Sequence, residues 1–353
     1  MRRRWPHVSI SLALALALAA SALGAGTAAD AQPGDEPPRA RTPGRPGLWR
    51  RIVDPNGDEV RTLVAKARAS MLRADEARNG DEEWALEQRA RFYRDAYNLL
   101  AYARKRAPEN VDALAAFARA AEELGRTAEA IEALERAAKL TSPERAPIEV
   151  VARLGALHLR AGDTERALRW LRLAQGPVPL HGNALEQAYA VIHYATVLAA
   201  RGDVAAAIHA IAAALPERSR SQVSHETTIL TFALAVLFDR DEQRAAAFEV
   251  LEHMQSTLGA QYRPQIQLEL ARMRFLPPED LHYYRALLYE SFNQYAEARA
   301  EWALYAAAGP PTYRGRALDH IQAIDAQRRA TAGAKPPQQP APASAIPRRL
   351  PVP

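Results

Sequence analysis

The sequence has 353 residues, of which 46 are Lys or Arg and 41 are Asp or Glu, and it contains no cysteine. Without a thiol the chain can form no disulfide, thiolate metal site or cysteine-linked lipid anchor. The basic excess lies at the ends, since residues 1–51 hold 8 basic and 3 acidic side chains and residues 328–353 hold 5 and none. Residues 52–327 therefore carry 33 basic and 38 acidic side chains, a net charge of −5, which argues against a nucleic-acid-binding core.

Residues 1–31 have the three-part pattern of a secretory signal. Three arginines precede an apolar run over residues 8–25, and small residues precede a cut expected before Gln32. A permanent membrane helix needs about 20 strongly apolar residues, so this shorter run favours cleavage over retention as an anchor. We therefore expect an exported protein, periplasmic or secreted, with no stable transmembrane segment after cleavage.

Two segments have the composition of disordered chain. Residues 32–51 and 329–353 are dense in proline and contain no periodic apolar face. The folded region is therefore predicted to span residues 52–328.

The first predicted helix follows a turn at residues 54–58, where Asn56 and Asp58 provide capping groups, and buries Val60, Val64 and Met71 on one face. The turn does not fit a calcium loop, because the required glycine and closing glutamate positions hold Glu59 and Ala65. A second helix is predicted over residues 84–106.

One helix–turn–helix pattern then occurs twice within residues 111–175. Each copy has a glycine at its turn, Gly125 or Gly162, followed by small and large apolar residues at fixed spacing, which are Ala130, Leu134 and Ala137 in the first copy and Ala167, Leu171 and Ala174 in the second. The pattern resembles the tetratricopeptide repeat (TPR), a unit of about 34 residues. The resemblance implies an all-α, right-handed superhelical solenoid of stacked helix pairs.

Further copies of the pattern follow toward the C-terminus, so that about five to six helix pairs are expected. A third sound copy covers residues 191–216. The next, residues 229–254, lacks a glycine at its turn, and its second helix is predicted to shift phase around residues 245–248. An extra helix is expected over residues 264–275, and another sound copy over residues 282–310. A final helix, residues 313–327, would cap the exposed end of the stack.

The sequence contains no recognisable catalytic or cofactor motif. It has no glycine-rich phosphate loop, no G-x-S-x-G elbow and no H-E-x-x-H helix. The nine histidines are scattered singly, and none has a second ligand at the spacing of a helical metal site. We therefore predict no catalytic residue, no metal site and no cofactor.

The TPR resemblance implies that the first helices of successive pairs line a concave groove that binds a protein or peptide. Arginine and tyrosine are well suited to anchoring such a partner. The candidate groove residues are Arg119, Arg153, Arg160, Tyr189, His193, Tyr283 and Tyr284. The alternative is a solvated face with internal ion pairs, such as one between Arg119 and Glu149. The Lys/Asn clamp of the chaperone-binding members is not expected, because Ala115, Arg119, Glu149 and Arg153 occupy the corresponding positions.

An apolar strip is expected in the degenerate copy, where groove-facing positions hold Leu230, Leu234, Leu237 and Phe238. Such a strip is unfavourable in water. We expect either the extra helix at residues 264–275 or a partner to cover it.

Three function classes remain. The first is an exported, periplasmic, non-enzymatic scaffold that binds another protein through its groove. The second is a structural subunit of a cell-envelope assembly that uses its outer faces and tails. The third is an enzyme or small-ligand receptor with a site between repeats.

Overall fold

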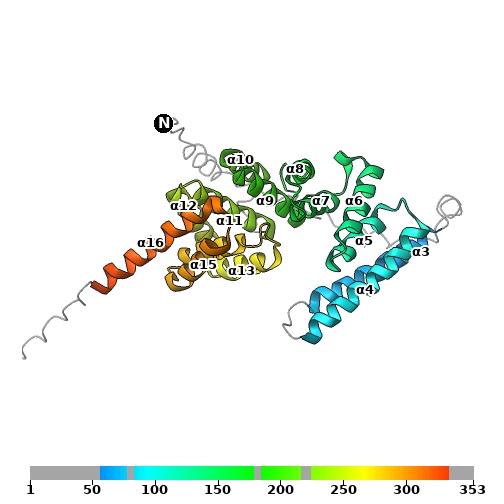
Figure 1. Ribbon diagram of the computed structural model, residues 1–353, viewed down its shortest axis with the longest axis horizontal. Helices are drawn as coiled ribbons and strands as arrows, with labels where there is room; N and C mark the ends of the chain where they lie inside the picture. The colour runs from blue at the N-terminus through cyan, green and yellow to red at the C-terminus, as the bar shows by residue number, and fades with distance from the viewer. Residues whose placement is uncertain (1–55, 78–82, 179–183, 216–223, 334–353) are drawn as a thin grey trace, which may run out of the picture. The chain divides into compact units, whose positions relative to one another are not determined.

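The computed structural model describes residues 56–77, 83–178, 184–215 and 224–333, and every regular element within them is a helix (Figure 1). This confirms the predicted all-α helical-repeat fold. The predicted signal, the 32–51 segment and residues 334–353 lie outside the described part. The chain divides into two compact units, each described by itself below: unit 1 extends to residue 158 and includes residues 165–174, and unit 2 comprises residues 159–164 and those from 175 onward.

Unit 1 contains a long helical hairpin followed by two shorter helix pairs. Its helices are α3 (Gly57–Glu76), α4 (Glu83–Arg106), α5 (Val111–Glu123), α6 (Thr127–Thr141), α7 (Ile148–Arg160, whose last two residues belong to unit 2) and α8 (Thr164–Arg172). Helix α4 packs against both α3 and α5, and α5 packs against α6. The predicted apolar face of the first helix is buried in the core of unit 1, as the low exposure of Val60, Val64 and Met71 shows.

Unit 2 continues the same alternation. Its helices are α9 (Ala184–Ala200), α10 (Val204–Ala214), α11 (His225–Arg240), α12 (Arg244–Leu258), α13 (Tyr262–Arg272), α14 (Asp280–Ser291), α15 (Tyr295–Ala308) and α16 (Pro311–Gly333). Helix α13 is the predicted extra helix, and it packs against α11, α12 and α14. Helix α16 is the expected final helix and packs against α15. It continues beyond residue 327 to Gly333, so residues 329–333 are helical and do not belong to a structureless tail.

The turn within each helix pair repeats one backbone geometry. The residue at the turn has a positive φ in five pairs, and these residues are Gly125, Gly162, Gly202, Glu242 and Asn293. In four of those turns the next backbone N–H donates to the carbonyl five residues earlier: Arg126 to Ala121, Asp203 to Leu198, Gln243 to Phe238, and Gln294 to Tyr289. This bond satisfies a carbonyl that the helix end would otherwise leave unpaired. The copy that lacks a glycine therefore keeps the turn, with Glu242 in the left-handed conformation.

The second helices of these pairs bury residues at the same positions. Counting from the turn residue, the fifth, ninth and twelfth positions are buried in every pair: Ala130, Leu134 and Ala137; Ala167, Leu171 and Ala174; Ala207, Ile211 and Ala214; Ala247, Leu251 and Met254; Ala298, Trp302 and Tyr305. The predicted phase shift around residues 245–248 is therefore wrong. Helix α12 is in phase, and only the small turn residue and the small final residue have been replaced by larger ones.

A glycine on α7 allows the two helices of its pair to approach closely. Gly155 is buried, and a Cβ atom built on it would overlap the Leu171 side chain of α8. We expect Gly155→Leu to lower the free energy of unfolding by about 1–3 kcal/mol through overpacking. Gly315→Leu is the matched control, because a Cβ on this α16 glycine meets nothing within 4 Å. Denaturant unfolding of both variants measures the difference, and an unchanged Gly155→Leu would contradict the packing.

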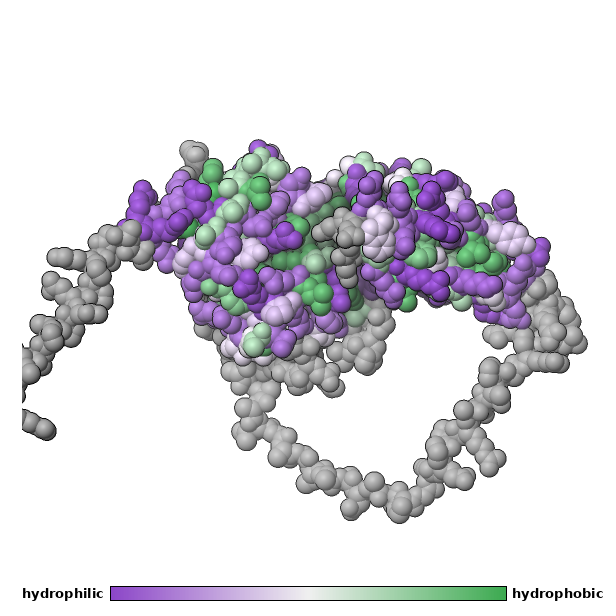
Figure 2. All heavy atoms as spheres, turned by 90° about the horizontal axis from the view of Figure 1, so that it is seen from below, coloured by the Kyte–Doolittle hydropathy of each residue, from purple (hydrophilic) through white to green (hydrophobic). Residues whose placement is uncertain are grey.

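Large apolar side chains on the surface are spread over several helices. Figure 2 shows one face on which hydrophilic residues predominate and apolar residues occupy separate areas between them. The exposed large apolar residues are Leu72, Trp84, Leu86, Tyr102, Leu140, Leu173, Leu268, Leu304 and Leu318. Singly exposed apolar residues are normal on soluble domains. Most apolar side chains therefore serve the cores of the two units.

Candidate functional site

Helices α3, α4, α5 and α7 of unit 1 present a set of charged side chains, which we call the charged face: Asp75, Arg89, Arg119, Glu122, Glu123, Glu149 and Arg153. The Arg119 guanidinium contacts the Asp75 carboxylate at 2.5 Å, and Arg153 contacts Glu122 at 2.7 Å and Glu149 at 3.7 Å. The predicted ion pair between Arg119 and Glu149 is therefore wrong, because Arg119 pairs with Asp75 and Glu149 pairs with Arg153. Each arginine pairs with a different carboxylate, and the expectation of internal ion pairs on this face is correct.

Helical spacing explains why these groups share one face. Glu149 and Arg153 are four residues apart on α7, which places them side by side. Arg119 and Glu122 are three residues apart on α5 and reach neighbouring helices in opposite directions, toward Asp75 on α3 and Arg153 on α7. The charged face is therefore a chain of contacts that crosses three helices of unit 1.

Two residues of α4, Tyr93 and Arg89, hold carboxylates of the charged face in place. The Tyr93 hydroxyl donates to Asp75 at 2.6 Å, and Arg89 contacts Glu123 at 2.5 Å. Burial and the Asp75 acceptor raise the pKa of Tyr93 to about 12, so this hydroxyl stays protonated and keeps donating. Arg119 and Arg153 nevertheless keep 35% and 21% of their side chains exposed, so both can be reached from solvent.

The corresponding face in unit 2 is covered by α13. The Tyr189 hydroxyl donates to Glu269 on α13 at 3.4 Å, and His193 Nε2 lies 2.9 Å from the carbonyl oxygen of Arg274 just after it. His193 is only 6% exposed. His193 is therefore unavailable to a partner, and the prediction that it lines an open groove is wrong. Tyr189 is half-buried, and its hydroxyl is hydrogen-bonded to α13. Arg160 is exposed at the end of α7.

The apolar strip on α11 is covered from within the chain. Leu230, Leu234, Leu237 and Phe238 are all buried in the core of unit 2. The same core contains Ile266 and Leu270 from α13 and Phe275 from the segment after it. The intramolecular alternative is thereby confirmed, since α13 packs directly against α11.

The two tyrosines expected near the far end of the groove are core residues. Tyr283 has no exposed surface and its hydroxyl donates to Asp239 at 2.6 Å. Tyr284 is 3% exposed, and its ring lies against those of Phe232 and Phe275. Both predictions are wrong for one reason: α14 is surrounded by α11, α13 and α15, so its inward positions never reach a surface.

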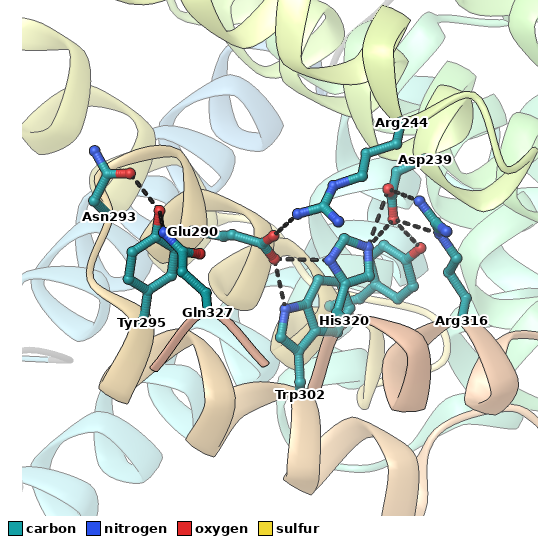
Figure 3. A network of polar contacts seen from close by, with 10 residues as sticks. Asp239, Arg244, Glu290, Asn293, Tyr295, Trp302, Arg316, His320 and Gln327 are labelled. Atoms are coloured by element: carbon teal, nitrogen blue, oxygen red, sulfur yellow. Dashed lines mark hydrogen bonds and ion pairs between the residues drawn. The ribbon is translucent and has the colours of Figure 1, made fainter. Parts of the chain in front are cut away.

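Tyr283 belongs to a polar network, which we define as Asp239, Arg244, Tyr283, Glu290, Trp302, Arg316 and His320. Figure 3 labels the members other than Tyr283. At its centre, His320 of α16 lies between two buried carboxylates. Its Nε2 is 3.0 Å from Asp239 on α11, and its Nδ1 is 2.8 Å from Glu290 on α14. Arg316 donates to Asp239 at 2.6 Å, and Arg244 of α12 contacts Glu290 at 2.6 Å. The network therefore joins four helices, and Trp302 adds a fifth.

Trp302 of α15 completes the surroundings of His320. Its indole N–H donates to Glu290 at 3.1 Å, and its ring is stacked on that of His320 with centroids 4.3 Å apart. A second buried pair lies nearby, where Arg240 contacts Asp280 at 2.7 Å beneath the rings of Tyr283 and Tyr313. Buried charges are tolerated only when paired and hydrogen-bonded. Each of these charges has an opposite charge in contact, although the buried Nε of Arg240 has no hydrogen-bond acceptor, and the contacts of Arg316 and His320 hold α16 on unit 2.

The charges in the network shift one another's pKa values. Burial alone would raise the pKa of Asp239, but hydrogen bonds from His320, Arg316 and Tyr283 hold it well below its usual range. Burial would lower the pKa of His320, but its contacts with Asp239 and Glu290 raise it above the ordinary value. The contacts with the two carboxylates therefore favour the protonated form of the His320 imidazole, since they raise its pKa.

These shifts predict how stability depends on pH. Because the folded pKa of His320 is raised, its contribution is complete below about pH 6.5 and is lost as pH rises through the folded pKa. We expect the thermal midpoint of unfolding to fall as the pH becomes alkaline. This fall should be smaller in His320→Gln. His209→Gln is the control, because His209 is exposed on α10. A steep alkaline fall that persists in His320→Gln would refute the assignment.

Sequence reasoning missed this network, although a signal was present. Tyr313, Ala317, His320 and Ile324 are spaced four, three and four residues apart, the spacing of one buried helical face, and all four are buried. The spacing therefore places His320 on the buried face of the final helix. A histidine at such a position requires buried partners.

The described residues contain neither a membrane-spanning helix nor a metal-binding cluster. No helix there is both long and apolar enough to span a membrane. No group of three or more His, Asp or Glu side chains in this part of the chain is arranged to hold a metal ion.

Comparison with known sequences assigns this chain to no family. No protein-family model matches the sequence, and no curated protein matches it. Among solved structures, the chain is similar to the TPR domain of P58(IPK), a crystal structure at 2.5 Å, with 17% sequence identity and a TM-score of 0.30 over 78% of this chain and 67% of that one. The turns and buried positions described above define this chain as a TPR-like α-helical repeat protein.

Proposed function

We propose that this chain is an exported, non-enzymatic scaffold, located in the periplasm, that binds another protein through the charged face of unit 1. The observation that carries the proposal is the difference between the two units. In unit 2 the corresponding face is covered by α13 and its polar groups are used internally, whereas Arg119 and Arg153 in unit 1 remain partly exposed.

The chemistry of the charged face suits protein recognition. Arginine guanidinium groups offer a planar set of donors that fits carboxylates and backbone carbonyls. Here they are held in place by neighbouring carboxylates, so little side-chain entropy would be lost on binding. The predicted secretory signal at residues 1–31 supports export. A repeat scaffold with no recognised catalytic motif is best suited to assembling other proteins.

A charge swap tests the proposal without removing the internal ion pair. Asp75→Arg combined with Arg119→Asp keeps opposite charges in contact and inverts the pattern that a partner meets. We expect proteins that crosslink to the wild-type chain in its native host to be lost from the variant. The exposed pair Lys66→Glu and Arg94→Glu is the control, and it should leave the crosslinked proteins unchanged.

The same experiment separates the scaffold from the competing proposal. If the chain is a structural subunit that uses its outer faces and tails, the charge swap will retain all of its crosslinked partners. That result, obtained with a variant that melts at the wild-type temperature, would refute binding through the charged face.

A further inference from the structure

A cleft opens between α4 and α6 in unit 1, with α5 beneath it. Its volume is about 260 Å³, and its apolar lining consists of Ala101, Pro108, Leu114 and Phe117. Leu114 and Phe117 are only 1% exposed, so the apolar surface that a ligand can reach comes from Ala101 and Pro108. This is smaller than the roughly 300–1,000 Å³ of typical small-molecule sites. The size fits a single apolar side chain with its flanking backbone better than a cofactor.

The cleft lies on the opposite side of α5 from the charged face. Phe117 lines the cleft, whereas Arg119, two residues later, belongs to the charged face. Two residues along an α-helix are separated by about 200° of rotation. The cleft is therefore a second surface, separate from the one in the proposed function.

Three cations surround the apolar lining: Arg104, Lys105 and Arg136. The Arg104 guanidinium lies flat over the Phe117 ring, 4.1 Å from its centroid, and its carboxylate neighbour Glu132 is 3.9 Å away. Among the described residues, Lys105 and Arg136 have no ion-pair partner, and Arg104 donates no side-chain hydrogen bond. These cations can therefore still bind an anion.

One carboxylate lines the cleft, and it is already engaged. Glu129 accepts a hydrogen bond from the Tyr97 hydroxyl at 2.6 Å and another from Arg126 at 3.3 Å. Arg126 in turn lies over the Tyr97 ring, 4.5 Å from its centroid. The lining as a whole is therefore positive, although residues 52–327 carry a net charge of −5.

The helix dipole explains only part of this arrangement. Arg104 and Lys105 lie in the last turn of α4, where basic residues are favoured by the partial negative charge of the helix end. Arg136 lies inside α6, where no helix end favours it, and it faces the same cleft. Cations from two helices thus converge on one cleft.

The chain's own ends are poor candidates for this cavity. Residues 1–51 hold 8 basic and 3 acidic side chains, and residues 328–353 hold 5 and none, so a positive cleft repels both. We propose that the α4–α6 cleft binds an acidic segment of another protein, which packs one apolar side chain against Ala101 and Pro108 and places carboxylates against Arg104, Lys105 and Arg136.

A peptide selection tests this site on the full chain. Displayed random short peptides are selected against the wild-type protein and counter-selected against the double variant Lys105→Glu, Arg136→Glu. We expect the recovered peptides to share a Phe, Leu or Trp flanked by Asp or Glu. One of them, labelled with fluorescein, should bind the wild type saturably by anisotropy, and its binding should weaken as salt is raised.

The double variant should bind this peptide about tenfold or more weakly, because two attractive contacts become repulsive. The control, Lys66→Glu with Arg94→Glu, changes the net charge equally at exposed positions outside the cleft and should bind within about twofold of wild type. Circular dichroism confirms that both variants are folded. The Asp75→Arg, Arg119→Asp swap should retain the peptide, so this proposal and the charged-face proposal can fail separately.

Several results would overturn the assignment. They are recovered peptides without the acidic and apolar pattern, an equal loss of affinity in both double variants, and a wild-type dimer that the cleft variant abolishes, which would assign the cleft to a second copy. Phosphatidylglycerol vesicles that bind the wild type and not the cleft variant, with no peptide recovered, would assign it to a membrane surface instead.

Discussion

Replacing Asp239 with alanine will lower the free energy of unfolding by about 3–5 kcal/mol, the range for removing one partner of a buried ion pair. Asp239 has no exposed surface and accepts from His320, Arg316 and Tyr283. Its loss would leave His320 with one carboxylate and Arg316 with none. The lost stability exceeds that of a cavity of the same size, because the half-buried Arg316 guanidinium is left without a carboxylate and His320 keeps only one.

Denaturant unfolding of Asp239→Ala and Asp319→Ala measures this effect. Asp319 is exposed on α16, immediately before His320 in the sequence, so its removal should change stability by about 0.5 kcal/mol or less. A further change, His320→Leu in the Asp239→Ala background, should recover part of the loss, since it removes a buried polar group that has lost one of its two carboxylate partners. Equal effects of Asp239→Ala and Asp319→Ala would contradict the network.

The second large effect is expected on α13. Leu270 is 3% exposed and packs in the same core as the apolar strip of α11, whereas Leu268, two residues earlier, is 42% exposed. Leu270→Asp should therefore destabilise unit 2 by about 4 kcal/mol or more, because it buries an unpaired carboxylate. Leu268→Asp, the same change on the same helix, should cost about 0.5 kcal/mol or less.

Dye binding shows what α13 covers. When α13 is displaced, Leu230, Leu234 and Leu237 become exposed as a contiguous apolar surface, which binds hydrophobic dyes and promotes association. Leu270→Asp, and more completely a deletion of residues 262–276, should increase dye fluorescence and lower solubility. If the deletion leaves both unchanged, α13 is not the cover of the strip.

Local sequence patterns were sufficient to predict the helix pairs. Small residues such as Ala130 and Ala167 recur at fixed distances after a turn glycine because two helices can pack closely only there. The pattern is harder to recognise where a larger residue fills the same position, as with Met254. The burial of Met254 shows that a change of residue size was mistaken for a change of helical phase.

The candidate groove was predicted less well, for a physical reason. A repeat pattern gives the side of a helix on which a residue lies, but exposure depends on whether another segment packs there. Arg119 and Arg153 lie on an open face, whereas His193 lies at the same kind of position under the chain that follows α13. The residues around Arg119, Arg153 and His193 in the sequence do not show which of these positions is open and which is covered.

The sequence by itself determined the all-α class, the pairing of helices and the residues that fill each pair, because those features depend on contacts between positions close in the chain. Tertiary structure decided which faces remain open and which charges are buried together. Asp239 and His320 are 81 residues apart, and Tyr189 and Glu269 are 80 residues apart. Such contacts follow from the path of the whole chain, which is why no local pattern predicted the network or the covering of the groove.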